Sequence, residues 1–404
     1  MKTNRYSLAI LFFTMLIVNT GFGVILPILP YYAQSLGASA TILGLLAATY
    51  ATIQFIFAPI WGRLSDRVGR KPILLIGLVG FSISFLIFGL ANRLWMLFLA
   101  RIIGGLLSSS TLPTALAFIS DTTRPDNRAR GMGLLGAAGG IGMILGPALG
   151  GFLGEISPQM PFFFSAGLAL VVAGFALVVL PETYPPAARL AASHRPPAVR
   201  RSRLHMIVSA LKGPLAFLMI LATLSSFGMA QLESTAALFA RARFNAGEAE
   251  MGAMFMLMGI LGVFAQFFLV APMIAKLGER HAIQVSLTGV GISMFLFGFV
   301  PSILIALPVV ILMGLSMAFL RPALNTLVSR SAPPSEQGVT MGMVNSFYSL
   351  GMMFGPVTGG LIFDQMGIAW PFFSAALVHL AGLAVSLVAF RQKSDPSSAP
   401  DSRA

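Results

Sequence analysis

The chain has 404 residues, of which 56% are hydrophobic and only 10% are charged. A soluble domain carries about 25% charged residues, so this composition excludes an ordinary soluble protein and indicates one built of membrane-spanning apolar segments. The chain has no cysteine, which excludes disulfides and thiol catalysis. Its four histidines do not show the spacing of metal ligands, so the sequence predicts no metal site.

Twelve apolar segments are each long enough to cross about 30 Å of hydrocarbon as a helix. They cover residues 8–30, 41–61, 73–91, 94–119, 131–154, 161–181, 214–238, 250–271, 282–300, 303–328, 339–361 and 370–390. No small-residue cleavage site follows the first segment, so we interpret it as a retained span rather than a signal peptide. The sequence therefore predicts an all-α membrane protein with twelve transmembrane helices.

The 26 lysines and arginines are distributed unevenly around these segments. If the N-terminus lies in the cytoplasm, most of them fall on the cytoplasmic side, and the outer loops hold Arg93, Arg241 and Arg243. Cytoplasmic loops of membrane proteins carry such an excess of basic residues. The pattern predicts a multi-pass protein of the cell membrane with both termini in the cytoplasm. It also explains the net charge of +13 without a nucleic acid partner.

The longest break between predicted spans covers residues 182–213, which are basic and contain several prolines. We interpret residues 1–181 and 214–393 as two six-helix halves that this cytoplasmic linker joins, and residues 394–404 as a disordered tail. The basic side chains of the linker either lie in solvent or contact anionic lipid headgroups.

The two predicted halves repeat each other in sequence. When the second half is aligned with the first at an offset of 209 residues, several glycines and prolines coincide. Among them are Gly105 with Gly314 and Pro113 with Pro322. Parallel repeats of this kind build one class of secondary transporter, whose substrate site lies between the halves near the membrane midplane. The repeat predicts two halves related by pseudo-two-fold symmetry, which rock to give alternating access.

The loop after the second predicted span reads 62-GRLSDRVGRK-71. Gly62 and Gly69 permit close approach or unusual dihedral angles, so the residues predict a tight cytoplasmic turn. Asp121 ends the fourth predicted span near the same membrane face, where it is sterically able to pair with Arg70. The alternative is a plain basic loop with a turn.

This motif resembles the signature loop of the major facilitator superfamily. The resemblance implies a cytoplasmic charge network, here called the latch, which consists of Asp66, Arg70 and Asp121 and stabilises the outward-facing state. The equivalent stretch of the second half, 271-APMIAKLGER-280, has Ala275 in place of the acid. We therefore expect the latch on one side only.

The fourth span begins 101-RIIGGLL-107 and resembles the drug:proton antiporters of that superfamily, although Gly104 stands where the family often has glutamine. The resemblance implies a part for Arg101 in proton transfer. Because an arginine inside a span must face protein or water, the alternative is an arginine that fixes helix packing through backbone carbonyls.

The fifth span contains the string 142-GMILGPALGG-151. Gly142, Gly146 and Gly150 share one helix face and let a neighbouring helix approach closely, while Pro147 disturbs the backbone hydrogen bonds. With Gly151, the string resembles the antiporter signature of drug-exporting facilitators. We expect it to contact the other half, with 351-GMMFGPVTGG-360 as its counterpart.

Glu233, within 227-FGMAQLESTAALF-239, is the one acid that we place well inside a predicted span. Its expected depth matches that of Arg101 better than that of Arg321. An ionised carboxylate away from water is costly unless a cation attends it, so Glu233 is able to take up a proton on one side and release it on the other. It alternatively pairs with an arginine to fix packing, or lies at the interface beyond a shorter span. The stretch resembles multidrug exporters of the Gram-positive type, which implies a proton-coupling role for Glu233.

Polar and adaptable residues inside the spans are candidates for the substrate-binding wall. They are Asn19, Gln54, Gln231, Glu233, Met258, Met317, Arg321, Asn325, Asn345, Phe347 and Tyr348. Methionine and phenylalanine offer an adaptable surface, as promiscuous pockets do, although each of them equally fits core packing or lipid contact. A lone acid in an apolar cavity favours lipophilic cations.

Together these features predict a proton-coupled antiporter that exports hydrophobic or cationic drugs across the lipid bilayer. We expect a monomer that uses the proton gradient and no cofactor. The alternatives are a facilitator that exports sugars or another endogenous metabolite, and a membrane sensor or lipid-handling protein without coupled transport. The sequence has no nucleotide loop and no nucleophile–base pair, so an enzyme is not expected.

Overall fold

The structure, a computed structural model, describes residues 5–123, 125–183, 215–333 and 337–392. All secondary structure elements in these ranges are helices. Eleven runs of helix are long and apolar enough to cross a membrane. The predicted all-α membrane fold is therefore confirmed, whereas nearly all of the predicted linker and the whole predicted tail lie outside the described residues.

One of the eleven runs is 50 residues long and covers Glu248–Phe297. It consists of α11 (Glu248–Phe264), the short π-helix η2 (Ala265–Leu269) and α12 (Val270–Phe297). Inside α12 the backbone leaves the helical conformation at Gly278, with φ 74° and ψ 160°. Because about 20 residues suffice to cross the hydrocarbon, Gly278 divides this run into two spans. That division accounts for eleven runs where the sequence predicts twelve spans.

The chain forms two compact units. Unit 1 comprises Met1–Arg200 and Glu233–Gly259, and unit 2 comprises Arg201–Leu232 and Ile260–Ala404. The predicted halves, 1–181 and 214–393, follow the sequence repeat and stay a prediction.

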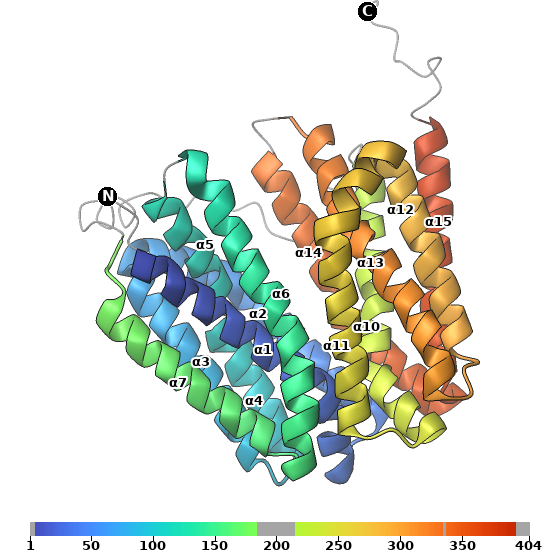
Figure 1. The fold of residues 1–404 in the computed structure, drawn as a ribbon, viewed down its shortest axis with the longest axis horizontal. Coiled ribbons are helices and arrows are strands. Elements are labelled where there is room, and N and C mark those ends of the chain that lie inside the picture. The colour runs from blue at the N-terminus through green and yellow to red at the C-terminus, as the bar shows by residue number, and fades with distance from the viewer. Residues whose placement is uncertain (1–4, 124, 184–214, 334–336, 393–404) are drawn as a thin grey trace, which may run out of the picture. The chain divides into compact units, whose positions relative to one another are not determined.

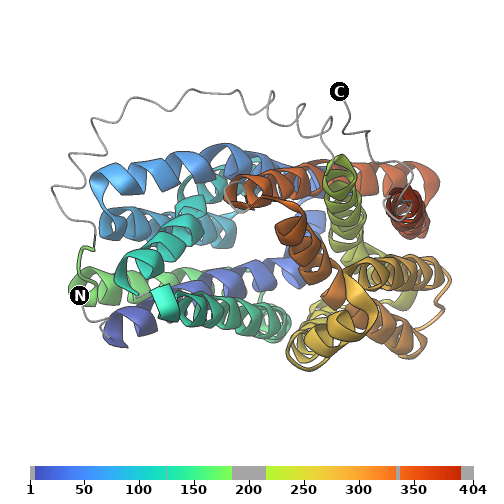
Figure 2. The same ribbon diagram turned by 90° about the horizontal axis from the view of Figure 1, so that it is seen from above.

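Unit 1 is built mainly from the first seven helices of the chain. They are α1 (Arg5–Ser35), α2 (Ala40–Val68), α3 (Arg70–Leu90), α4 (Leu94–Leu107), α5 (Thr111–Thr122), α6 (Pro125–Ile156) and α7 (Met160–Val179). Figures 1 and 2 both show α6, in teal, alongside α1, in dark blue. The interior contains stacked rings, with 4.2 Å between the centroids of Phe81 and Phe85 and 5.2 Å between those of Phe88 and Phe162. Such aromatic pairs add stability beyond the area that they bury.

The fourth predicted span is not one continuous α-helix, because the 3-10 turn η1 (Ser108–Ser110) separates α4 from α5. Serine hydroxyls compete for backbone carbonyls in this way. Ser108 Oγ donates to the Gly104 carbonyl at 2.5 Å, and Ser110 Oγ donates to the Ile73 carbonyl of α3 at 3.1 Å. The serines therefore both bend this span and attach it to α3.

Unit 2 contains the first part of α10 (Ala216–Phe244), α12, α13 (Ile303–Ser331), α14 (Gln337–Met366) and α15 (Trp370–Gln392). Within it α12 packs against both α13 and α15. Its buried core includes Leu221, Leu287, Ala323 and Phe347. Phe347 is thus a core residue in this structure, rather than part of the substrate-binding wall that the sequence suggested.

The motif 62-GRLSDRVGRK-71 is mostly helical, which corrects the predicted loop. Helix α2 continues to Val68 and α3 begins at Arg70, so Gly69 alone separates the two helices. Gly69 has φ 122°, a conformation that residues with a side chain rarely adopt. Gly278, which lies 209 residues later, also has a positive φ. The sequence repeat therefore has a structural counterpart at this break.

Candidate functional site

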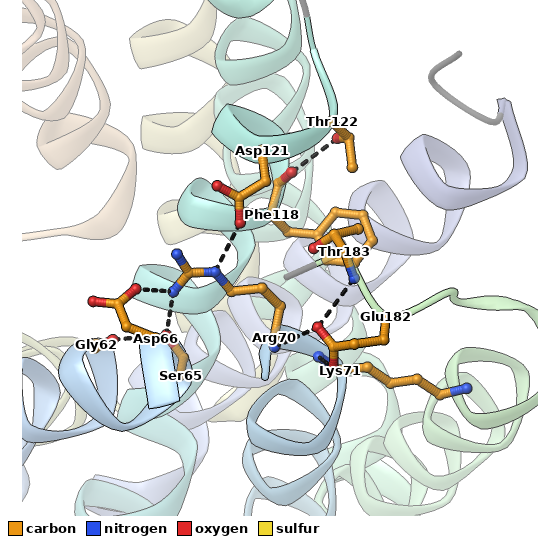
Figure 3. A network of polar contacts seen from close by, with 10 residues as sticks. All are labelled: Gly62, Ser65, Asp66, Arg70, Lys71, Phe118, Asp121, Thr122, Glu182 and Thr183. Atoms are coloured by element: carbon orange, nitrogen blue, oxygen red, sulfur yellow. Dashed lines mark hydrogen bonds and ion pairs between the residues drawn. The ribbon is translucent and has the colours of Figure 1, made fainter. Parts of the chain in front are cut away.

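The side chain of Arg70 is the centre of a polar network at the start of α3 (Figure 3). Its NH1 lies 2.6 Å from Asp66 Oδ1 and 2.6 Å from Ser65 Oγ of α2, and its Nε lies 2.9 Å from Asp121 Oδ2 of α5. Only 7% of the Arg70 side chain is exposed. A planar guanidinium group holds two carboxylates in this way because its donors form a rigid fork. The structure thus brings the three predicted latch residues together.

Glu182 is a further acid in this network, and the sequence analysis gave it no role. Its Oε1 accepts from the backbone N–H of Arg70 at 2.9 Å, and its Oε2 accepts from that of Lys71 at 3.3 Å. The first N–H groups of a helix have no partner within the helix, and an acid stabilises that end. Glu182, just beyond α7, therefore caps α3 and fixes the backbone that carries Arg70 (Figure 3).

Unit 2 contains an equivalent ion pair of opposite polarity. Arg330 NH1 lies 2.5 Å from Glu279 Oε1. A shift of 209 residues places Glu279 on Arg70 and Arg330 on Asp121. Ala275 indeed replaces the acid Asp66, but the pair itself is present with its charges exchanged. The expectation of a network on one side only is therefore wrong.

Arg101 of α4 is buried, with 7% of its surface exposed. Its guanidinium carbon lies 5.7 Å from the centroid of the Tyr50 ring and 5.6 Å from that of Phe88. Aromatic faces attract a cation in this range. Its Nε is buried without a hydrogen-bond partner among the described residues. The two rings, rather than backbone carbonyls, therefore hold this arginine.

Glu233 of α10 is half-buried, between the buried residues Leu232 and Ser234. Among the described residues, no hydrogen bond or ion pair to its carboxylate is found, and none joins it to Arg101. The expected electrostatic pairing of these two residues is therefore not present in this conformation. A carboxylate without a partner in an apolar setting is energetically costly.

Three glycines of the 142–151 string face α1 of the same unit. A Cβ on Gly142 would lie 2.6 Å from the Leu16 carbonyl oxygen, and one on Gly146 would lie 2.6 Å from Gly23 Cα. Gly150 faces Val24 of the same helix. These glycines therefore let α6 and α1 touch through their backbones.

The other side of the string contacts α11, which lies in unit 1 but belongs to the predicted half 214–393. The string therefore makes the expected contact with the other half through this helix. A Cβ on Gly252 would lie 2.6 Å from the Pro147 carbonyl oxygen and 3.0 Å from Gly151 Cα. Side chains at 151 and 252 would thus separate α6 from α11. Unit 2 repeats the first contact, since a Cβ on Gly351 of α14 would lie 2.6 Å from the Phe227 nitrogen of α10.

Five predicted wall residues line one cavity in unit 2. They are Met317, Arg321, Asn325, Asn345 and Tyr348. The cavity has a volume of about 170 Å³ and is also lined by His379.

The remaining wall candidates lie elsewhere. Asn19 Nδ2 donates to the Met15 carbonyl within α1 at 2.8 Å, and buried Gln231 donates to Thr358 Oγ1 at 3.2 Å. Gln54 and Met258 are half-buried residues of unit 1. The structure therefore does not gather all eleven candidates into one pocket.

Residues 11–270 and 236–404 each match the family model described as Major Facilitator Superfamily. The chain belongs to the major facilitator superfamily. It is therefore a multi-pass membrane protein of a transporter family.

Facilitators similar to this one include named resistance proteins. The chain is 34% identical to Multidrug resistance protein 1 of Bacillus subtilis, an alignment that covers 96% of this chain and 97% of that protein. It is 33% identical to the class H tetracycline resistance protein of Pasteurella multocida over 91% of each chain. A bacterial homologue of the human lysosomal transporter Spinster, solved in an inward-facing and occupied conformation, has a TM-score of 0.79 at 17% identity over 98% of each chain. This last similarity supports the fold.

Four residues of this facilitator that the sequence analysis did not select have defined places in the structure: Glu182, Glu279, Arg330 and His379. The 209-residue shift contained the signal for the Glu279–Arg330 pair, because it aligns opposite charges at both positions. The sequence feature that pointed to Glu182 was weaker: it is an acid directly after a predicted span. His379 had only its position in the last span.

Proposed function

We propose that this facilitator is a proton-coupled antiporter that exports hydrophobic and cationic drugs by alternating access. Two of its resistance-protein relatives, at 34% and 33% identity over most of the chain, support this class of substrate. The proton gradient is the energy source in this proposal, and no cofactor takes part. The working unit is a monomer with both termini in the cytoplasm.

Glu233 is the observation on which the proposal rests. It is an acid on a membrane-spanning helix, and no described residue pairs with its carboxylate. Such a group changes its protonation as water reaches it and leaves it. It therefore serves as the site that either a proton or a cationic drug occupies.

The cycle follows from that competition. Glu233 faces the cytoplasm without its proton and accepts the drug. The halves 1–181 and 214–393 then rock, and the latch of Asp66, Arg70 and Asp121 stabilises the outward-facing state. A proton from outside displaces the drug, and the protonated carrier returns. Arg101, buried between the rings of Tyr50 and Phe88, also takes part in proton transfer in this proposal.

The 142–151 string provides the surface on which these movements occur. Backbone contact between α6 and α11 at Pro147, Gly151 and Gly252 has no side chains that must interlock. A contact of this kind opens and closes at little cost, which an alternating-access cycle requires.

Everted membrane vesicles that contain the full chain test the proposal. An imposed proton gradient, acidic inside, should drive accumulation of ethidium, and a proton uncoupler should abolish it. Vesicles without the protein provide the blank. If no gradient-driven accumulation of ethidium or of a fluoroquinolone occurs, the exporter function is wrong. Saturable transport of a polar sugar without a response to ethidium would instead indicate a metabolite facilitator.

A further inference from the structure

The cavity of unit 2 is large enough for part of a drug molecule. Its volume of about 170 Å³ exceeds the roughly 150 Å³ of an engineered protein cavity that holds benzene. The walls come from α10, α12, α13, α14 and α15. The cavity therefore accommodates one aromatic ring with a small substituent.

Most of the walls are apolar, and the charge among them is positive. Met229, Met317, Leu320 and Leu324 provide a soft surface for a ring. Ser225, Arg321, Asn325, Asn345, Tyr348 and His379 provide polar groups. No acidic residue is among the described residues that line the cavity. An anion therefore meets no like charge there.

Arg321 carries a positive charge that is available to a ligand. Its guanidinium carbon lies 4.5 Å from the centroid of the Tyr348 ring, and its surface is exposed. A guanidinium group that stacks on a ring keeps the N–H donors at its edge free. Among the described residues, no hydrogen bond or ion pair occupies those donors. They match a carboxylate, which accepts two parallel hydrogen bonds from such a fork.

His379 is a second polar group that the protein leaves open at this cavity. Only 1% of its surface is exposed, and its Nδ1 lies 2.8 Å from the Ala375 carbonyl oxygen. That contact makes Nδ1 the donor and leaves Nε2 without a partner among the described residues. A Cβ on Gly228 would lie 2.7 Å from His379 Nδ1, so the glycine provides the space for the ring. Nε2 is then an acceptor, so His379 fits a hydrogen-bond donor elsewhere on a ligand rather than a carboxylate.

We propose that this cavity binds an aromatic ring that carries a carboxylate, with Arg321 as its counter-charge. The ring packs on the methionine and leucine side chains, and the carboxylate takes the free donors of Arg321. The inference rests on the proposed function and extends it, because it adds acid-bearing aromatic compounds to the cations that Glu233 attracts.

A matched pair of ligands tests this proposal. Binding of benzoate and of uncharged benzamide to the purified full-length protein is measured by equilibrium dialysis at pH 7, with empty detergent micelles as the blank. The acid should bind at least about tenfold more tightly than the amide, because a charge-assisted hydrogen bond contributes that much. Arg321→Gln should reduce the preference to about threefold or less, whereas Arg321→Lys, which keeps the charge but loses the fork, should retain only part of it. Lys276→Gln, at an exposed basic residue of α12 outside the cavity, is the control and should keep the full preference.

Equal affinity for the acid and the amide would overturn the proposal. The proposal would also be overturned if the Arg321→Gln variant kept the preference for the acid. The same holds if Lys276→Gln reduced that preference as much as Arg321→Gln does. The outcome is separable from the proposed function. If ethidium export continues while the acid shows no preference, this inference alone fails. If the acid binds as expected and no gradient drives ethidium, the proposed function alone fails.

Discussion

Glu279 and Arg330 form in unit 2 the ion pair that Arg70 and Asp121 form in unit 1, with the charges exchanged and 209 residues between equivalent positions. The exchange has a physical consequence at the helix end. A positive charge is unfavourable at a helix N-terminus, and in unit 1 Glu182 compensates for it by capping α3. In unit 2 the residue directly after the break at Gly278 is the acid of the pair, Glu279, rather than its base. The second pair therefore needs no separate cap.

Reversing the charges of the Glu279–Arg330 pair tests whether the two residues stabilise the protein through their contact. Glu279→Arg and Arg330→Asp should each lower the thermal unfolding midpoint of the purified protein. The double variant should recover only part of the loss, because a positive charge at position 279 is unfavourable at this end of the helix. Because 71% of the Arg330 side chain is exposed, we expect a coupling free energy of about 0.2–1 kcal/mol. The coupling should decrease in 1 M salt, which screens exposed charges. Strictly additive effects of the two substitutions would show that the contact contributes no free energy to stability.

Arg70→Lys tests the geometry of the latch. The ammonium group of lysine is unable to occupy the positions of both Nε and NH1, so one carboxylate loses its charge-assisted hydrogen bond. The loss of about 1.5 kcal/mol should slow proton-driven ethidium export roughly tenfold if it raises the barrier of the rate-limiting step. Arg67→Lys, at an exposed neighbouring residue of α2, is the matched control. Equal rates for the two variants would exclude a role for the fork.

Gly146→Ala tests the backbone contact between α6 and α1. The new methyl group would lie about where Gly23 Cα requires space, 2.6 Å away. Forcing a methyl group into a packed interior costs about 1–3 kcal/mol, and the thermal midpoint should fall accordingly. Gly136→Ala on the same helix meets no atom within 4 Å and should leave the midpoint unchanged or slightly higher. A fall of the same size in both variants would point to the helix as a whole rather than to this contact.

The composition and the lengths of the apolar runs were enough to predict the helical membrane fold, because spans of about 20 apolar residues have few alternatives in a bilayer. The details inside the spans were harder to predict. Three serines convert part of the fourth span into a 3-10 turn by binding carbonyls, which hydropathy does not register. Gly278 divides α12 through a positive φ, and its equivalence to Gly69 was visible in the 209-residue shift.

Contacts at the candidate site depend on which face of each helix a residue occupies. Depth along the spans placed Arg101 near Glu233, yet Arg101 lies between Tyr50 and Phe88. Depth alone does not fix rotation about a helix axis, so the pairing did not follow. The latch was predictable from the resemblance of the 62–71 motif to the family signature, and the structure joins Arg70 to both Asp66 and Asp121. The charge-exchanged pair does not follow from matching like residues, because Glu279 stands at the position of Arg70 and Arg330 at that of Asp121.

The central claim is that proton and drug compete for Glu233. It is tested most directly by measuring proton release when ethidium is added to the purified protein in a weakly buffered solution with a pH indicator, at a starting pH acidic enough that Glu233 holds its proton. The native protein should release protons on binding, Glu233→Gln should release none, and Glu155→Gln, at an exposed acid near the end of α6, should behave as the native protein does. If Glu233→Gln releases as many protons as the native protein, then Glu233 is not the proton carrier and the account is wrong.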